Sequence, residues 1–382
     1  MNIRLVAVLV FAILLAHTVL IHLLLKTDSI AAASAGKRAE IEQTEGEKED
    51  FPAGGETSAE KTKPDTDPSP GKKEVLPPAG PSGNTPAVRP GIPAVKSQVS
   101  PSKKFVLDYS KAVRGKIPKV SGLTDTASGI LVDLDTGRVL WEKNSARSYP
   151  IASMSKLMTM LIAAEKVKDG TLPDGFNTRI AVTREAVLVQ PSKVNLMMGE
   201  TFTLRELLTA SAVKSANDAA WLVGQYLGGG KIDTFITMMN KRAAELGMKS
   251  TVFFNPHGLP GASKGKDNRS SAVDMVILCS EFMRHKELCE LTSLRSAEFR
   301  KPGEKGYLKF YNHNNLLPGA KFGTKGVNGL KTGFTSRAGF CLAVSCSRSG
   351  RNLLAIVTGF PDLKGRDTFT RNLLEWGYRQ KL

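Results

Sequence analysis

A possible nucleophile and a possible base stand three residues apart in the stretch YPIASMSKLMTM. They are Ser153 and Lys156, which would share one side of a helix. A serine hydroxyl needs an adjacent base, and a lysine can be that base once burial or a cationic neighbour lowers its pKa. The spacing alone is weak support, because other serines also precede a lysine by three positions: Ser34, Ser58, Ser69, Ser100, Ser211 and Ser263. Ser153 differs from these six serines in its position, which is the point where a strand-like run ends and a long apolar helix begins.

A second polar pair, Ser215 and Asn217, interrupts the apolar helical run TASAVKSANDAAWLVG. A hydroxyl and an amide inside such a run need hydrogen-bond partners if they are buried. A local helix cap would supply them. Contacts with Lys156 and with the amide of a substrate would do so as well, and the sequence leaves both explanations open.

A third motif, Lys331-Thr332-Gly333, occurs in NGLKTGFTSRAGFCLAV, on the expected edge of a strand. Glycine in a strand lets a ligand approach the backbone closely. Lysine and threonine offer a carboxylate a positive charge and a hydroxyl donor. In the order S-x-x-K, S-x-N, K-T-G within one domain, the three motifs are the signature of active-site-serine penicillin-recognising enzymes.

The segments around the motifs predict an α/β (α+β) domain. Residues 127–144 alternate and turn at Asp135-Thr136-Gly137, and residues 339–360 do so at Arg348-Ser349-Gly350, so each range predicts a β-hairpin. Apolar helical periodicity predicts helices in the segments 151–170, 203–228, 232–248, 271–292 and 366–382. Strands at both ends of the domain predict one antiparallel sheet, flanked by helices, in which the terminal strands meet.

The N-terminal part predicts a membrane anchor and a linker. Residues 5–25 are almost entirely apolar after Arg4, and at helical rise they span roughly 30 Å, the thickness of a bilayer core. A possible cleavage site, Ala33-Ser34-Ala35, lies well beyond this run, which favours an uncleaved anchor over residues 1–26. Residues 27–104 are charged and then rich in proline, glycine and serine, as is typical of a disordered linker. The catalytic domain is then expected over residues 105–382.

The charge of the chain narrows the possible partners. Its formal net charge is +17, and all but one unit of the excess lies in residues 105–382. A basic domain suits an anionic partner such as a carboxylate-rich polymer, and the absence of known nucleic-acid-binding motifs argues against nucleic acid.

The cysteines and histidines suggest neither a metal site nor a cofactor. The spacing of the four cysteines predicts buried or free thiols, with a Cys279–Cys289 disulfide as the alternative. The odd spacing of Cys341 and Cys346 puts them on opposite faces of one strand.

Beyond the three motifs, the sequence resembles the low-molecular-mass penicillin-binding proteins that act as D-alanyl-D-alanine carboxypeptidases. The resemblance covers roughly residues 118–380 and includes the blocks YPIASMSKLMT, MNKRAAELGMKSTVFFNPHGLP and GRDTFTRNLLEWGY. It implies a β-lactamase/transpeptidase-like fold, a peptidoglycan stem peptide as substrate and β-lactam antibiotics as covalent inhibitors.

The resemblance also implies a role for each site residue. Ser153 attacks the carbonyl between the last two D-alanines, Lys156 takes its proton, and Ser215 relays a proton to the leaving amine. Asn217 holds the substrate amide. Residues expected at the substrate's carboxylate and at the oxyanion are Lys331, Thr332, Gly333, Phe334 and Arg366. The product is an acyl-enzyme, which water then hydrolyses.

Three other functions remain open at this stage. Relatives that lack an extra C-terminal domain include D,D-endopeptidases, which cleave peptidoglycan cross-links. A β-lactamase would need a further carboxylate, and no Glu-x-x-Leu-Asn occurs between Lys156 and Lys331. A non-catalytic wall-binding module is the third. In each case the apolar N-terminus predicts a location in the bacterial cell envelope, with the domain outside the cytoplasmic membrane.

Overall fold

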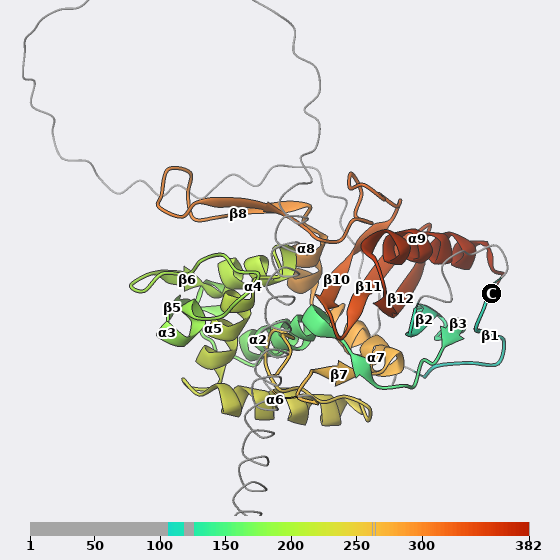
Figure 1. Cartoon of the computed structure of the whole chain (residues 1–382), viewed down its shortest axis with the longest axis horizontal. Coiled ribbons are helices and arrows are strands. Elements are labelled where there is room, and N and C mark those ends of the chain that lie inside the picture. Colours follow the sequence, from blue (N-terminus) through green and yellow to red (C-terminus); the bar gives the residue numbers. More distant parts are fainter. Residues whose placement is uncertain (1–105, 118–125, 262, 264, 382) are drawn as a thin grey trace, which may run out of the picture. The chain divides into compact units, whose positions relative to one another are not determined.

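A six-stranded sheet dominates one half of the computed structural model, which describes residues 106–117, 126–261, 263 and 265–381 (Figure 1). Its strands lie in the order β1-β3-β2-β12-β11-β10. Their bounds are Val113–Arg114 (β1), Ser128–Asp133 (β2), Val139–Lys143 (β3), Val327–Thr335 (β10), Gly339–Arg348 (β11) and Arg351–Phe360 (β12). The last strand, β12, pairs antiparallel with β2, so the predicted meeting of the terminal strands is confirmed.

Both predicted hairpins are present. In the turn between β2 and β3, the Asp133 carboxylate accepts hydrogen bonds from the amide and hydroxyl of Thr136, and Gly137 has a φ of 74°. Between β11 and β12 the chain turns through Ser349 and Gly350, which both have positive φ. Two such residues in a two-residue loop match the twist of the flanking strands.

The sheet is antiparallel as predicted, except for one parallel pair at the β1 edge. The two-residue strand β1 pairs parallel with β3, Val113 opposite Trp141. The Trp141 indole nitrogen also donates to the carbonyl of Gly115 at 2.7 Å. β1 lies before the residues that show alternation. Two residues are too few to form an alternating pattern, so this strand could not be predicted.

The helices follow the predicted order, with one correction at the first. The α-helix α2, Lys156–Lys168, begins at Lys156, and the residues before it form a 3-10 turn, η2, Ala152–Ser155. Ser153 therefore lies in the turn and not in the helix. The other helices are α3 (Arg184–Val187), α4 (Leu204–Val213), α5 (Asn217–Leu227), α6 (Ile232–Leu246), α7 (Ala272–Phe282), α8 (Lys286–Ser293) and α9 (Leu363–Arg379).

Small two-stranded pairs and one short turn complete the described elements. Their bounds are Tyr149–Pro150 (β4), Gly175–Asn177 (η3), Arg179–Ala181 (β5), Thr201–Thr203 (β6), Arg269–Ser270 (β7), Ser296–Phe299 (β8) and Leu308–Tyr311 (β9). The pairs are β4 with β7, β5 with β6, and β8 with β9.

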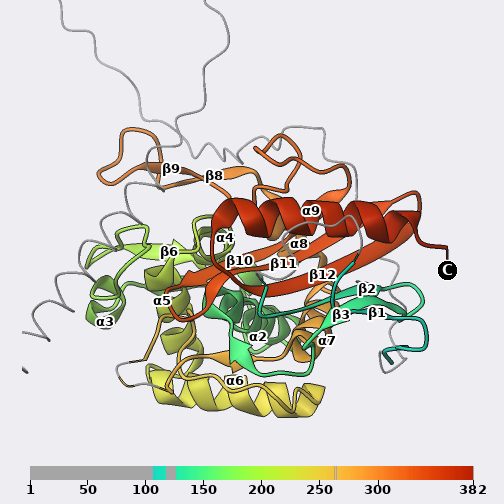
Figure 2. The same cartoon turned by 45° about the vertical axis from the view of Figure 1, so that its right-hand side comes forward.

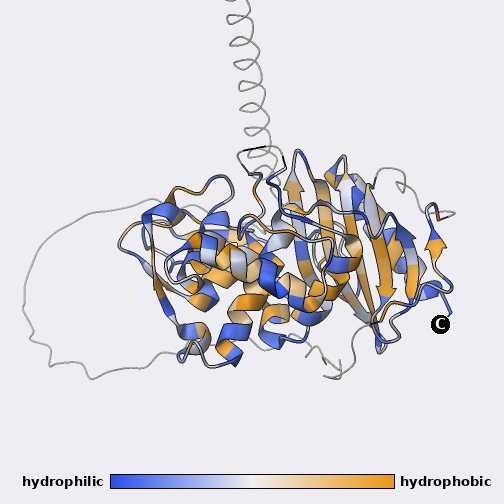
Figure 3. Ribbon diagram, turned by 90° about the horizontal axis from the view of Figure 1, so that it is seen from below, coloured by the Kyte–Doolittle hydropathy of each residue, from blue (hydrophilic) through white to orange (hydrophobic). Residues whose placement is uncertain are grey.

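Helices cover both faces of the sheet. The C-terminal helix α9 packs on one face, and α7 and the other helices lie on the opposite side (Figure 2). Each face has its own apolar core: Trp141, Phe360 and Phe369 belong to the α9 side, while α2, α4 and α5 supply much of the other. Apolar residues accordingly line the strands and the inner sides of the helices (Figure 3).

All four cysteines lie among the described residues and are free thiols, so Cys279 and Cys289 do not form a disulfide. They sit on separate helices, α7 and α8. As expected from their spacing, Cys341 and Cys346 pack into the two different cores on either side of β11.

The predicted anchor over residues 1–26 and linker over residues 27–104 lie outside the described residues. Within the part that is described, no helix combines the length and the apolar character needed to cross a membrane.

Candidate active site

The nucleophile candidate Ser153 lies in the η2 turn, which the surrounding backbone encloses closely. Ala152, just before it, has a φ of 45°, which is uncommon for a residue with a Cβ. A Cβ added to Gly258 would lie 1.9 Å from the carbonyl oxygen of Ala152, and one added to Gly333 would lie 2.7 Å from that of Ile151. The two glycines therefore let their chain segments pack directly against the turn that carries the serine.

Lys156 is fully buried and connects three parts of the site. Its Nζ lies 2.9 Å from Ser153 Oγ, 2.6 Å from Asn217 Oδ1 and 2.8 Å from the carbonyl oxygen of His257. Burial, followed by the positive charge of Lys331, holds the pKa of Lys156 well below its usual range, and Asp218 partly opposes this. A neutral amine is therefore more accessible at this lysine than in water, as a general base for serine requires.

The break between α4 and α5 brings the S-x-N motif to this lysine. Ser215 lies in the break with a φ of 62°, and Asn217 begins α5. Besides its bond with Lys156, Asn217 donates through Nδ2 to the carbonyl of Pro191 at 2.5 Å, and its amide donates to the carbonyl of Ser192 at 2.8 Å. Of the two predicted partners of Lys156, Asn217 makes the contact. The Ser215 hydroxyl forms no hydrogen bond within the described residues.

The loop that Asn217 touches, residues 188–200, is fixed from two directions. The buried carboxylate of Asp218 accepts from the amides of Val194 and Leu196 at 3.1 and 3.2 Å. From the other side, Arg300 binds the Glu200 carboxylate at 2.6 Å. Asp218 thus acts as a buried hydrogen-bond partner of this loop.

The K-T-G motif lies on β10, which is the edge strand of the sheet and contacts η2. Lys331 is 2% exposed and Thr332 is 6% exposed. Burial and the nearby Arg366 lower the pKa of Lys331 to about 7. Phe334 follows the motif and stacks against Phe340 of β11, with their ring centroids 4.2 Å apart. An edge strand leaves backbone groups unpaired, so β10 can still bind an extended peptide.

Arg366 lies in the first turns of α9, where it is buried against the sheet. Its guanidinium binds the Asp367 carboxylate at 2.6 Å and donates to the carbonyl of Cys341 at 3.3 Å. Asn315 donates to the other oxygen of Asp367 at 3.0 Å. The arginine is thus placed to influence Lys331 while its own charge is compensated by Asp367.

Sequence reasoning missed three contributors to the site. The backbone carbonyl of His257 holds Lys156, Gly258 makes room for the η2 turn, and Asp367 compensates Arg366. Only the Asn-Pro-His-Gly stretch hinted at the first two. The histidine of this stretch has a structural role: its ring accepts a hydrogen bond from the Leu259 amide, and burial lowers its pKa to about 3.

A separate group of possible metal ligands, Glu165, Glu281 and His285, lies on α2, on α7 and just after α7. Arg242 already forms a two-pronged pair with Glu165, the shortest distance being 2.6 Å, and lies 3.7 Å from Glu281. The two carboxylates are therefore already compensated by a cation.

The arrangement around Ser153 can perform acyl transfer. A hydroxyl touches a buried amine of lowered pKa, an amide side chain holds that amine, and a buried cation with a hydroxyl lies on a neighbouring edge strand. These are the parts of a serine nucleophile with a lysine base and a carboxylate-binding strand.

Comparison with known proteins agrees with this geometry. The sequence model of peptidase family S11, described as D-alanyl-D-alanine carboxypeptidase, matches residues 118–361. D-alanyl-D-alanine carboxypeptidase DacF of Bacillus subtilis is 33% identical over 258 residues, which are 67% of this chain and 63% of the relative. A D-alanyl-D-alanine endopeptidase of Pseudomonas aeruginosa is 32% identical over 65% of this chain and 78% of that protein.

Solved structures give the same result for the fold. Penicillin-binding protein D2 of Listeria monocytogenes, in an ampicillin-bound form, aligns with a TM-score of 0.58 and 30% identity. The alignment covers 67% of this chain and 98% of that one. The mixed fold of a sheet between helices is therefore that of the penicillin-binding proteins.

The chain spans less than two thirds of the length of the first curated relatives it matches, at 63%, 61% and 62%. The match of the family model, in contrast, extends over more than half of the chain and includes all three motifs. The chain belongs to peptidase family S11, the D-alanyl-D-alanine carboxypeptidase family.

Proposed function

We propose that the protein is a serine D-alanyl-D-alanine carboxypeptidase that removes the terminal D-alanine from peptidoglycan stem pentapeptides. The observation that carries the proposal is the 2.9 Å contact between Ser153 Oγ and the Nζ of the buried Lys156. Membership of the family and the names of its curated relatives support the substrate class.

The proposed reaction begins with proton transfer. Neutral Lys156 removes the proton of Ser153 as the serine oxygen attacks the carbonyl carbon between the two D-alanines. The tetrahedral oxyanion is held by backbone amides of Ser153 and Phe334. When the C–N bond breaks, the proton that Lys156 took from Ser153 is relayed through the Ser215 hydroxyl to the leaving amine, and D-alanine departs. Water then attacks the ester, which releases the shortened peptide and restores the serine hydroxyl.

The binding roles follow from charge. Lys331, with Thr332 and supported by Arg366, would hold the terminal carboxylate of the substrate, while Asn217 holds an amide of the acyl part. Gly333 lets the substrate lie close to β10. A β-lactam carries a carboxylate and an amide in similar places, so it would acylate the same serine. The ampicillin-bound relative supports this expectation.

The test is labelling of the full-length protein with a fluorescent penicillin, followed by mass spectrometry of the Ser153 peptide. Wild-type protein should gain the mass of one penicillin on that peptide, and Ser153→Ala should gain none. Ser155→Ala is the matched control, since the Ser155 hydroxyl donates to the Ala152 carbonyl and is not among the hydrogen-bond partners of Lys156 Nζ. Labelling that persists in Ser153→Ala would overturn the assignment of the nucleophile.

A D,D-endopeptidase would use the same residues, and the endopeptidase relative supports it as the second candidate. Digestion of purified muropeptides separates the two. Release of free D-alanine from uncross-linked pentapeptides identifies the carboxypeptidase. Conversion of cross-linked dimers into monomers without free D-alanine identifies the endopeptidase.

The proposed location is the cell envelope, with the domain outside the cytoplasmic membrane. The apolar run at residues 5–25 supports an N-terminal anchor. Membranes washed with alkaline carbonate should retain the full chain, and external protease should degrade the domain in spheroplasts. Release of the protein by the wash would contradict the anchor.

A further inference from the structure

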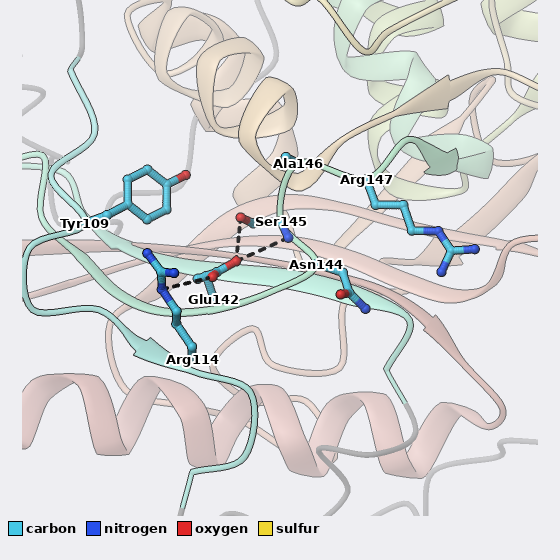
Figure 4. Close-up of a pocket in the computed structure, with 7 residues that line it drawn as sticks. All are labelled: Tyr109, Arg114, Glu142, Asn144, Ser145, Ala146 and Arg147. Carbon is cyan, nitrogen blue, oxygen red and sulfur yellow. Dashed lines mark hydrogen bonds and ion pairs between the residues drawn. The ribbon is translucent and has the colours of Figure 1, made fainter.

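A cavity lies away from the candidate catalytic residues, at the opposite edge of the six-stranded sheet from β10. Its volume is about 500 Å³. It is lined by Tyr109, Arg114, Glu142, Asn144, Ser145, Ala146 and Arg147 (Figure 4). Since β1 and β3 lie at one edge of the sheet and β10 at the other, this cavity is separate from the candidate site at Lys331.

Two arginines with unused donors flank the cavity. The Arg114 side chain is 71% exposed, and its only polar side-chain partner in the described part of the chain is Glu142, at 3.5 Å. The guanidinium of Arg147 lies 6.0 Å from the ring centroid of Tyr149 and pairs with no carboxylate among the described residues. A guanidinium presents several N–H groups that match a carboxylate in a two-pronged pair, so both arginines can still bind one.

A single carboxylate lies between the two arginines. Glu142 Oε2 accepts a hydrogen bond from Ser145 Oγ at 2.7 Å, which fixes the carboxylate at the cavity wall. In the view of Figure 4, Arg114 and Arg147 lie on opposite sides of Glu142 and Ser145. The charged side chains that line the cavity are therefore two arginines with one glutamate between them, and their net charge is +1.

We propose that this cavity binds an amino-dicarboxylate group, with Arg114 and Arg147 each taking a carboxylate and Glu142 the ammonium group. This inference rests on the proposed function in one respect: an uncross-linked wall peptide presents such groups, so the cavity would hold the polymer while the site at Ser153 cleaves it. The net charge of the ligand complements that of the cavity. Glu142 repels a dicarboxylate that lacks an amine, which gives the cavity its specificity.

The test is isothermal titration of the full-length protein in detergent, after benzylpenicillin has blocked Ser153. The probe is L-Ala-γ-D-Glu-meso-diaminopimelate, which carries ammonium and carboxylate groups and lacks the D-alanines. Saturable binding is expected, and Arg114→Ala and Arg147→Ala should each raise its Kd about 10-fold, the effect of losing one charged two-pronged pair. Arg184→Ala is the matched control, since Arg184 is an exposed arginine on α3, and it should change the Kd less than twofold.

Glu142→Gln sharpens the test, because it removes the charge but keeps an acceptor for Ser145. It should weaken binding of the peptide and strengthen binding of glutarate, a dicarboxylate without an amine. Arg147→Lys covers the case in which Arg147→Ala does not fold: it keeps the charge, loses the fork and should bind more weakly than wild type.

Two outcomes overturn the proposal: no saturable binding, or an equal loss in Arg184→Ala, which would mean non-specific attraction to a basic domain. Failure of benzylpenicillin to acylate Ser153 counts against the proposed function instead. The effects of the cavity variants are read independently of it.

Discussion

The two edges of the sheet carry positive charge in opposite ways. At the β10 edge, Lys331 and Lys156 are buried and their pKa values are lowered, while at the β1 edge Arg114 stays exposed. Burial costs an ammonium group its hydration, so the buried lysines are shifted toward the neutral form that can move protons. An exposed guanidinium keeps its hydration and can only bind. Burial thus lowers the pKa of both lysines, although Lys156 is proposed as a base and Lys331 as a carboxylate-binding group, whereas Arg114 at the other edge is proposed only to bind.

The largest effect is expected when the buried Lys156 is replaced. Lys156→Ala should slow acylation by penicillin about 10³-fold, within the range ascribed to general bases, and Lys156→Arg should not restore it because a guanidinium is not a base at neutral pH. Stopped-flow labelling gives the rate. Arg114→Ala and Arg147→Ala should leave that rate unchanged, and a comparable loss in either variant would contradict the separation of the two edges.

A matched pair of glycines tests how tightly each edge is packed. Gly258, against the η2 turn, and Gly115, beside β1, both have positive φ, of 92° and 72°. A Cβ on Gly258 would collide with the backbone at 1.9 Å, whereas a Cβ on Gly115 would meet nothing within 4 Å. Gly115→Ala should therefore cost only the backbone strain, about 1–2 kcal/mol in the free energy of unfolding.

Gly258→Ala should cost clearly more, on the order of 4 kcal/mol, and should also slow acylation by displacing Ala152. Urea denaturation measures the first effect and penicillin labelling the second. Equal destabilisation by the two substitutions would contradict this expectation. It would show that the η2 turn can shift to make room for the new Cβ with no further loss in the free energy of unfolding.

The smallest expected effect is a pH dependence of KM, which should arise at the β10 edge and not at the β1 edge. The pKa of Lys331 is about 7, so its positive charge, and with it the hold on a substrate carboxylate, should fall as the pH rises through 7. The KM for a D-alanyl-D-alanine peptide should rise by a few-fold between pH 6.5 and about pH 8, as expected for loss of one charge contact. Lys331→Arg should abolish this rise. Peptide binding in the cavity beside β1 should not follow it, because guanidinium groups stay charged over this range.

The same shift has a defined sign for stability. Between pH 7 and the ordinary lysine pKa, the unfolded chain binds a proton at Lys331 that the folded chain has released. The contribution of Lys331 to the free energy of unfolding therefore rises with pH over that interval and is lowest below pH 7. Replacement by methionine should flatten this part of the pH–stability profile.

Local patterns predicted much of the fold and most of the candidate site. The two hairpins, the break at Ser215 and the edge position of Lys331 each depend on periodicity or turn residues that the sequence displays directly. The contact of Asn217 with Lys156 could also be expected once the motifs were taken together. Whether each of these residues has its assigned catalytic role stays a prediction until the variants are measured.

The remainder could not be predicted, for physical reasons. The carbonyl of His257 holds Lys156 through the backbone, which every residue possesses, so no residue type marks it. Gly258 is required because of an atom about a hundred residues away in sequence. The cavity beside β1 is lined by residues from two separate segments of the chain. Only the parallel pairing of β1 with β3 brings their side chains together, and that pairing could not be predicted.

The pairing of β2 with β12 has a consequence for how the molecule is made. More than two hundred residues separate Val132 from its partner Leu354, so the strand that pairs with β2 is synthesised long after β2 itself. Until β12 has been synthesised, the β2–β3 hairpin has one unpaired strand edge, and its apolar side chains are uncovered. A chain cut before Arg351 cannot close the sheet at all, so the sheet can form only after β12 has been synthesised.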